Sequence, residues 1–366
     1  MNEWKTVRLG DYITEYSVKN KSNEDIPVYS VTNTQGFCTE YFSKDVSSKD
    51  KSNYKIVPRG CFAYNPSRIN VGSVDWQRYE DRVIVSPLYN VFKVSPELEN
   101  QYLYYFLKSD IGHTLITSKA EGSVRDNLKI TMLAEFSIPL PPLETQKLIA
   151  AQLDKCTALI AKHKQMLEKY DTLIKSRFIE MFGTDKDFSK WNCCCVEDVA
   201  DVTVGVVIKP TQYYCEKGIP AFRSLNIGEM KVNDSDWVYF TEEGNKKNKK
   251  SILKENDVLV VRSGAPGKSC VITKKYEGYN VVDAIIAHPN LEKVNPVFLC
   301  MFTNMPHGMN QIKAKTGGAA QQHFNVGGYN ALKMILPPLS LQNDFASFVQ
   351  QIDKSKFENT TQEIAA

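Results

Sequence analysis

The two halves of this sequence carry the same landmarks in the same order, and this repetition constrains the fold more than any other feature. Near the start of each half, three positions recur at an offset of 187 residues, as Trp4 and Trp191, Leu9 and Val196, and Asp11 and Asp198. Further on, Leu-Pro-Pro-Leu followed by glutamine recurs at an offset of 196, as 140–143 with Gln146 and 336–339 with Gln342. Ordered landmarks with small insertions between them indicate a duplicated unit of roughly 190 residues. This period is far too long for a solenoid, so we predict a tandem pair of domains.

Each Pro-Pro segment introduces a stretch with helical periodicity. In residues 144–182, apolar side chains return every seven positions, as Leu153, Ile160, Leu167, Ile174 and Met181. A strict seven-residue repeat keeps one stripe facing a partner helix, so the pattern predicts a coiled coil. Prolines before the stretch and Gly183 after it are typical helix boundaries. The alternative is a single long helix lying on a globular core.

The second helical stretch, residues 339–366, starts like the first but does not continue like it. Its apolar stripe consists of Phe345, Val349 and Ile352. The positions that should continue the stripe are Asn359 and Ala366, and Thr360-Thr361 are weak helix formers. We therefore predict a second helix about half as long as the first, either because the natural chain stops early or because this is a truncated product.

Composition fits two ordinary globular domains. The chain has 366 residues, of which 42% are hydrophobic and 24% are charged, so each half can bury a core. Its net charge of +3 does not by itself indicate nucleic-acid binding, so any basic surface must be local. The start of the chain does not resemble a signal peptide, and no apolar run is long enough to span a membrane. Nine cysteines in such a chain favour a reduced, cytoplasmic protein.

Short runs rich in β-branched residues predict strands in both domains. The predicted strands cover residues 26–31, 82–85, 89–94, 258–261 and 271–274. Residues 96–108 predict a helix, and its counterpart in the second half begins at Pro296. The order of the strands in a sheet does not follow from these patterns. We predict an α+β fold with two α/β domains, residues 1–143 and 183–338, separated by two long helices that form an antiparallel coiled coil.

No motif in the sequence predicts catalysis. Ser263–Ser269 ends in Gly-Lys-Ser like a phosphate-binding loop, but Arg262 stands where that loop needs glycine, and a strand rather than a helix follows. A hairpin turn is the better interpretation. Tyr64–Ser67 resembles the Asn-Pro-Pro-aromatic loop of amino-methyltransferases but lacks its second proline and its aromatic residue. Cys193–Cys195 lacks the spacing of a zinc site, and we predict no metal.

Two polar segments occupy equivalent places ahead of the two Pro-Pro pairs. They are residues 119–125 and 315–323, and Lys119 matches Lys315 while Arg125 matches Gln321 at the offset of 196. Arginine reads guanine and glutamine reads adenine by paired hydrogen bonds, so this exchange is one that a reader of DNA sequence would vary. Glycines in both segments allow a close approach of backbone to a partner. The alternative is an ordinary surface loop.

Several of these motifs together resemble the specificity subunit of type I restriction–modification systems. The residues that carry the resemblance are Trp-x-x-Val-x-Leu-Gly-Asp at 4–11, Pro-Leu-Pro-Pro-Leu-Glu-x-Gln at 139–146, the end of the first long helix at 174–183, and 352–357 in the second helix. The resemblance spans nearly the whole chain. The chain departs from the family pattern in its shorter second helix and in Val196-Glu197-Asp198, where members have Leu-Gly-Asp.

The resemblance implies a DNA reader that is not itself an enzyme. Each of its two target-recognition domains would read one half of a split site in double-stranded DNA, and the two helices would pair antiparallel and dock two methyltransferase subunits. A restriction subunit would join the full complex. S-adenosylmethionine, ATP and magnesium would be bound by these partners, and this chain would hold no cofactor. The DNA motif itself does not follow from the sequence.

We predict DNA contacts from loop position and side-chain type. In the first domain they are Asn65, Ser67, Arg68, Lys119 and Arg125, and in the second they are Arg262, Ser263, Lys268, Lys315, Gln321 and Gln322. Helix pairing and subunit docking are assigned to Leu153, Ile160, Leu167, Ile174, Met181, Phe345, Val349 and Ile352. The rival functions are a divergent adenine methyltransferase and a coiled-coil tether whose domains bind protein.

Overall fold

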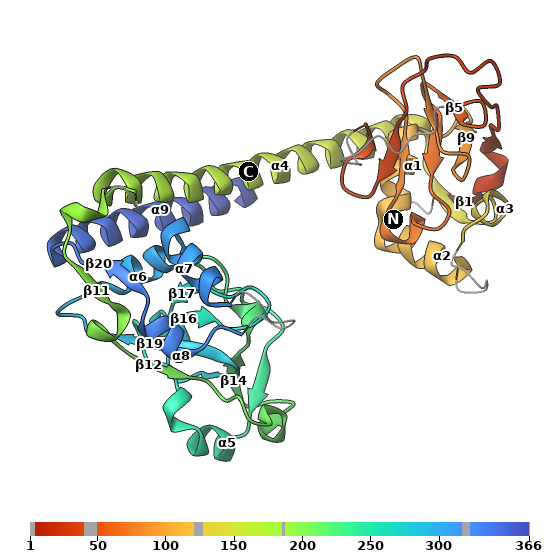
Figure 1. Ribbon diagram of the computed structural model, residues 1–366. Coiled ribbons are helices and arrows are strands. Elements are labelled where there is room, and N and C mark those ends of the chain that lie inside the picture. Colours follow the sequence, from red (N-terminus) through yellow and green to blue (C-terminus); the bar gives the residue numbers. More distant parts are fainter. Residues whose placement is uncertain (1–3, 40–49, 121–126, 185–186, 317–322, 366) are drawn as a thin grey trace. The chain divides into compact units, whose positions relative to one another are not determined.

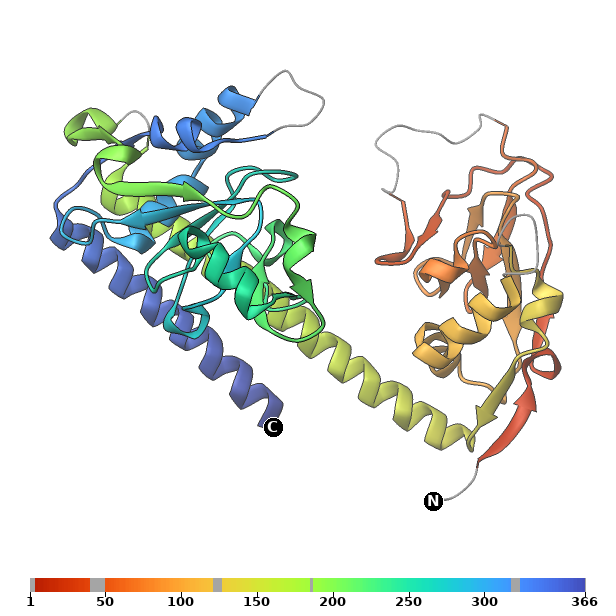
Figure 2. The same cartoon turned by 90° about the horizontal axis from the view of Figure 1, so that it is seen from below.

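The chain forms two compact units joined by one continuous helix. The computed structural model describes residues 4–39, 50–120, 127–184, 187–316 and 323–365 (Figures 1 and 2). The first unit is Met1–Lys162 and the second is His163–Ala366, so the long helix α4 (Leu143–Phe182) belongs to both. In the described residues, no helix is long and apolar enough to cross a membrane.

The first unit is built from short strands followed by helices. Its strands are β1 (Lys5–Arg8), β2 (Ile13–Glu15), β3 (Ser30–Thr32), β4 (Gly36–Cys38), β5 (Lys55–Pro58), β6 (Phe62–Tyr64), β7 (Val74–Trp76), β8 (Arg82–Val85), β9 (Asn90–Val94) and β10 (Ser137–Leu140). Its helices are α1 (Asn100–Lys108), α2 (Asp110–Ala120), α3 (Ile130–Leu133) and the first part of α4. A four-stranded antiparallel sheet in the order β2-β9-β6-β7 packs against α1, and Phe62 stacks on Phe92 across it with ring centroids 5.0 Å apart.

The second unit repeats this plan and extends it. Its strands are β11 (Cys193–Cys195), β12 (Ala200–Val204), β13 (Tyr214–Cys215), β14 (Ile219–Phe222), β15 (Val238–Phe240), β16 (Val258–Val261), β17 (Ser269–Val271), β18 (Asn280–Val281), β19 (Ala284–Pro289) and β20 (Lys333–Ile335). Its helices are α5 (Glu242–Lys247), α6 (Pro296–Asn304), α7 (Pro306–Thr316), α8 (Val326–Asn330) and α9 (Leu339–Ala365), with the second part of α4. The order β12-β19-β16-β17 matches that of the first unit, which confirms the α+β tandem repeat. A second sheet, β13-β15-β14-β18, is an elaboration of this unit.

The strand predictions agree with the structure in part. Residues 82–85 and 258–261 are strands as predicted, and the predicted strand 89–94 is β9. The predictions for 26–31 and 271–274 are wrong in extent, because β3 starts only at Ser30 and β17 ends at Val271. In both cases the apolar run continues past the ladder, so burial in the core and backbone pairing do not coincide.

A buried glutamine fastens each long helix to its domain. Gln146 accepts a hydrogen bond from the backbone N–H of Glu99, at 2.8 Å, and its amide donates to the carbonyls of Glu97 and Pro141. Gln342 does the same with the backbones of Asn295, Lys293 and Pro337. Both glutamine side chains are fully buried, and each partner lies 196 residues from its counterpart. The repeated Leu-Pro-Pro-Leu-x-x-Gln segment is therefore a structural joint.

Helix α4 ends as the sequence predicts. Gly183 has φ +85°, and its N–H donates to the carbonyl of Ile179 at 2.8 Å, which is the left-handed termination that glycine adopts without strain. Residues 151–162 of α4 are all exposed, whereas Ile174, Phe178 and Phe182 are buried in the core of the second unit.

Helix α9 lies antiparallel to the second part of α4 within the second unit (Figures 1 and 2). Phe345 packs on Phe178 with ring centroids 5.4 Å apart, and Lys356 pairs with Asp171 at 3.0 Å. Helix α9 spans 27 residues against 40 for α4, so it is about two thirds as long rather than half, and its backbone stays helical through Thr360-Thr361. Threonine costs a helix well under 1 kcal/mol, so two threonines do not end one.

Candidate nucleic-acid interface

Six of the eleven predicted DNA contacts lie on hairpin loops, three in each unit. Asn65, Ser67 and Arg68 lie in the connection between β6 and β7, and Arg262, Ser263 and Lys268 lie in the connection between β16 and β17. The two hairpins join the same two strands of the repeated sheet, and Ser67 matches Ser263 at the offset of 196. The repeat therefore presents one loop, twice, with different side chains on it.

The second pair of polar segments adjoins these hairpins. In the first unit the N–H of Leu128 donates to the carbonyl of Pro66 at 3.1 Å, and in the second the N–H of Phe324 donates to the carbonyl of Arg262 at 2.9 Å. Both bonds join equivalent positions of the repeat. Arg125, Gln321 and Gln322 lie outside the described residues, but the chain on the carboxyl side of each segment is tied to the hairpin loop. In each unit, a described residue on the carboxyl side of the polar segment is thus bonded to the hairpin loop.

The loop of the first unit borders a hollow. The side-chain oxygen of Asn65 accepts from the N–H and the hydroxyl of Ser67, at 3.1 and 3.0 Å, which fixes the turn. Asn65 and Arg68 line a concavity of about 640 Å³ whose other walls are formed by residues 30–33, Val71, Ser73, Ser86, Leu88 and Tyr89. The hollow offers hydroxyl, amide and guanidinium groups beside the exposed side chain of Leu88.

The loop of the second unit is organised by charge. Arg262 Nη1 lies 2.8 Å from Oδ1 of Asp283, and the hydroxyl of Ser263 lies 3.4 Å from the other carboxylate oxygen. The same hydroxyl is 2.8 Å from Nδ1 of His323. Four side chains thus form one chain of contacts, Arg262–Asp283–Ser263–His323, at the point where the hairpin meets the polar segment. Asp283 and His323 were not among the predicted contacts.

The predicted lysines differ in what they already contact. Lys315 donates to the carbonyls of Gly328 and Ala331, at 3.0 and 3.1 Å, and so closes the end of α8. Lys119 pairs with Glu135 at 2.8 Å, and this hydrogen bond lowers the pKa of the Glu135 carboxyl. Lys268 is exposed on the hairpin. A lysine held by its own chain is less available to a phosphate, so Lys268 is the best placed of the three for such a contact.

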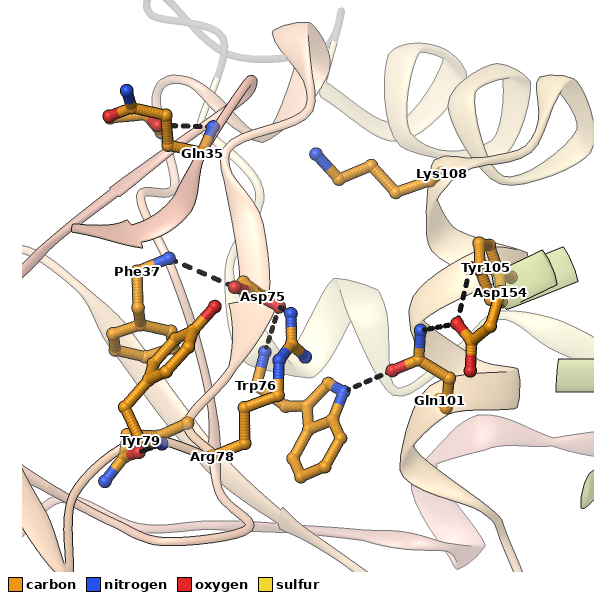
Figure 3. Close-up of polar contacts among 12 residues, drawn as sticks. Gln35, Phe37, Asp75, Trp76, Arg78, Tyr79, Gln101, Tyr105, Lys108 and Asp154 are labelled. Atoms are coloured by element: carbon orange, nitrogen blue, oxygen red, sulfur yellow. Dashed lines mark hydrogen bonds and ion pairs between the residues drawn. The ribbon is translucent and has the colours of Figure 1, made fainter. Parts of the chain in front are cut away.

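A polar cluster that the sequence did not reveal lies at the edge of the first sheet (Figure 3). Asp75 is fully buried, accepts from the N–H groups of Phe37 and Trp76, and lies 3.2 Å from Arg78. Burial raises the pKa of Asp75, and the charge of Arg78 opposes that rise. The Arg78 guanidinium also lies over the ring of Trp76, with 4.9 Å to its centroid. The sequence feature that could have indicated this cluster is an aspartate between Val74 and Trp76, in a run that forms a buried strand.

This cluster continues to the long helix. The indole N–H of Trp76 donates to Gln101, and the amide of Gln101 donates to Asp154 on α4 at 2.8 Å (Figure 3). Tyr105 donates to the same carboxylate at 2.7 Å. The start of α4 is therefore held to α1 by side chains as well as by Gln146, and the cluster supports the scaffold of the first unit.

The predicted helix-pairing residues separate into two groups. Ile174, Phe345 and Val349 are buried, and Met181 and Ile352 pack against the same core. Leu153 is 38% exposed and Ile160 57% exposed, and Leu167 is half-buried. The pairing that the structure describes therefore uses the part of the seven-residue repeat that lies in the second unit.

The segment Ser263–Ser269, which resembles a phosphate-binding loop in sequence, is a hairpin turn. Gly264 and Gly267 have φ +83° and +96°, and β17 follows directly and pairs antiparallel with β16. No helix starts at Ser269, so the backbone lacks the row of N–H groups that holds phosphate. Within the described residues, no group of three or more histidine, cysteine, aspartate or glutamate side chains is placed to bind a metal ion.

Comparison with known proteins gives one consistent result. The model of the type I restriction modification DNA specificity domain matches residues 1–169 and again residues 189–366. The chain is 23% identical to the type I restriction enzyme MjaVIII specificity subunit of Methanocaldococcus jannaschii, over 96% of this chain and 86% of that protein. It is 22% identical to the EcoBI specificity subunit of Escherichia coli, over 62% of this chain and 53% of that one, so it spans about half of the second relative.

Solved structures share the fold at low sequence identity. A type I restriction-modification S subunit from M. genitalium aligns with a TM-score of 0.57 and 14% identity, over 98% of this chain and 91% of that one. A chain from a structure of complex assembly and conformational transition in the type I restriction-modification system aligns with a TM-score of 0.54 and 16% identity, over 100% and 94%.

Proposed function

This chain belongs to the type I restriction modification DNA specificity family, and from that membership we propose that it is the subunit that reads a split DNA site. Each unit reads one half-site through its hairpin loop and the polar segment beside it. Lysine and arginine side chains contact phosphates and fix the register, while Asn65, Ser67, Arg68, Arg262 and Ser263 face base edges. The observation that carries the proposal is the repeat of one loop arrangement on two units with different side chains.

The chemistry of the complex is assigned to partner subunits. We propose that methyltransferase subunits dock on the two long helices and use S-adenosylmethionine, and that a restriction subunit uses ATP and magnesium. The chain itself contributes recognition and no catalysis, which is supported by the failed phosphate-loop and methyltransferase motifs. We place this work in the cytoplasm, and the nine cysteines, all free, are consistent with a reducing compartment.

A methylation map of genomic DNA tests the proposal. Cells would express this chain together with the methyltransferase subunit of its own system, and control cells would express the methyltransferase subunit alone. The expected result is a new split motif, two short specific halves around a fixed gap, seen only with the chain present. Variants Arg68→Ala and Arg262→Ala then assign the halves, because each should relax positions in one half and leave the other unchanged.

Assembly must be checked in the same cells. Co-purification of the chain with the methyltransferase subunit establishes that the complex forms. An assembled complex that adds no sequence-specific methylation would contradict the proposal. DNA affinity that is absent, or that barely changes with salt, would instead favour a tether whose domains bind protein, because phosphate contacts release counterions. Binding of S-adenosylmethionine by the isolated chain would favour the rival methyltransferase.

A further inference from the structure

The arginine of the second hairpin is held in a geometry suited to one kind of base pair. Arg262 directly follows the fully buried strand β16, and its carbonyl is fixed by the N–H of Phe324. Its guanidinium is held through Nη1 by Asp283 at 2.8 Å, and the side chain remains 22% exposed. Both ends of the arginine are thus restrained before any partner arrives. Pre-organisation of this kind favours directional hydrogen bonding over loose charge attraction.

The carboxylate that holds the arginine is itself rigidly placed. Asp283 adopts φ +46°, a left-handed conformation, between the buried residues Val282 and Ala284. The N–H of Val282 donates to Phe222, and the N–H of Asp283 donates to Val206. A non-glycine residue in this region carries backbone strain, and such strain is often found where a side chain must point in one direction.

The pair matches the chemistry of a G·C base pair better than that of a phosphate. The bond to Asp283 uses Nη1, and the opposite edge of the guanidinium, Nε and Nη2, has the spacing to meet O6 and N7 of guanine. A carboxylate beside the arginine repels a phosphate, whereas it can accept from the N4 amine of the cytosine paired with that guanine. We propose that Arg262 reads a guanine in the half-site of the second unit and that Asp283 is the residue that positions it.

The first unit lacks this device. By the register of the two sheets, Phe62 pairs with Phe92 as Val258 pairs with Ala287, so the counterparts of Arg262 and Asp283 are Pro66 and Leu88. Neither side chain can donate or accept a charged hydrogen bond. This arginine–aspartate pair therefore belongs to the second unit alone, so the first half-site serves as an internal reference in every experiment on the pair.

The test compares base preference at each position of the bound site. This inference rests on the proposed function, so the assembled complex of the chain with its methyltransferase subunit is used to select sites from a random double-stranded DNA library. The chain is compared with its variants Arg262→Lys, Arg262→Ala and Asp283→Asn. Arg262→Lys is the sharpest, because it keeps the charge and loses the planar pair of donors.

The expected result is confined to one position. The second half-site of the unaltered chain should contain a G·C pair that Arg262→Lys and Arg262→Ala no longer require, with affinity for the G·C site lowered roughly tenfold to a hundredfold. Asp283→Asn should weaken the preference at that same position. The first half-site should be selected normally in all three variants, which shows that the altered chains are folded and assembled.

Two outcomes would overturn the inference. If Arg262→Lys keeps both the preference and the affinity, the arginine acts as a point charge. If Arg262→Ala weakens all sequences equally and lowers the slope of log K against log salt by about 0.9, it contacts a phosphate. Selection of no split motif by the unaltered chain would be a different failure, that of the proposed function itself.

Discussion

Replacing Gln146 by leucine should destabilise the first unit by about 3 kcal/mol. The glutamine is fully buried and makes three hydrogen bonds, with the N–H of Glu99 at 2.8 Å and the carbonyls of Glu97 and Pro141 at 3.0 and 2.9 Å. Leucine has a similar volume, so it leaves no large cavity, but it leaves three buried backbone groups without their partner. Each such group costs about 1–3 kcal/mol, and the lower end applies where a carbonyl keeps another partner.

The assay is urea and thermal unfolding of the full chain, with hydrogen exchange to locate the change. A loss of about 3 kcal/mol lowers the midpoint of a unit of this size by roughly 6–12 °C. Exchange should rise at the amide of Glu99 and in α1. Gln152→Leu is the matched control, because it makes the same substitution on an exposed turn of the same helix.

The equivalent substitution in the second unit provides an independent comparison. Gln342→Leu should act on the second unit and cost slightly less, because its contact with the carbonyl of Lys293 is long, at 3.4 Å. If Gln146→Leu unfolds at the same midpoint as Gln152→Leu, the joint is not held by these hydrogen bonds and the reasoning is refuted. Hydrogen exchange that accelerates equally in both units after either substitution would also contradict it.

Three further predictions concern packing, charge and the hairpin. Phe345→Ala should cost about 3–5 kcal/mol, because its fully buried ring contacts Phe178, and urea unfolding of the second unit measures this. Burial raises the pKa of Asp75 above its usual 3.8, so the native protein holds this proton more tightly than the unfolded protein does. The free energy of unfolding should therefore fall as pH rises from about 3.8 through the raised pKa, and it should not fall in this way in Asp75→Asn. A stability difference between wild type and Asp75→Asn that does not change with pH would contradict this. Gly267→Ala should destabilise more than Gly264→Ala, since both have positive φ but only the Cβ at 267 would meet side-chain atoms, at 2.7 Å, and equal melting temperatures would count against this.

The parts of the fold that depend on local pattern could be predicted from the sequence. The ends of α4 and the exclusion of a phosphate-binding loop follow from residues close together in the chain, and the duplication follows from short motifs that recur at offsets of 187 and 196 residues. The order of strands could not be predicted, because strands of two to six residues carry too little pattern to specify partners more than 20 residues away. The length of α9 relative to α4 was underestimated, because helix propensity is a weak guide to where a helix ends.

The candidate site shows the same division. Loop position and side-chain type led to Arg262 and Ser263, which the structure places together. They did not lead to Asp283 or His323, whose role depends on contacts across 21 and 60 residues. They also could not show that Lys315 is bound to the carbonyls of its own domain, since a lysine that closes a helix and a lysine that meets DNA look alike in sequence.

The buried glutamines give the molecule a mechanical character. Because a fully buried glutamine bonds each long helix to its domain, the connection between domain and helix is rigid and does not act as a flexible hinge. Compliance then belongs to the exposed turns of α4 that follow the contacts of Tyr105 with Asp154 and Thr157. Any strain that a bent or over-twisted duplex exerts would be stored there as elastic bending of a single helix, so stiffening this span is a way to make the reader less tolerant of imperfectly spaced sites.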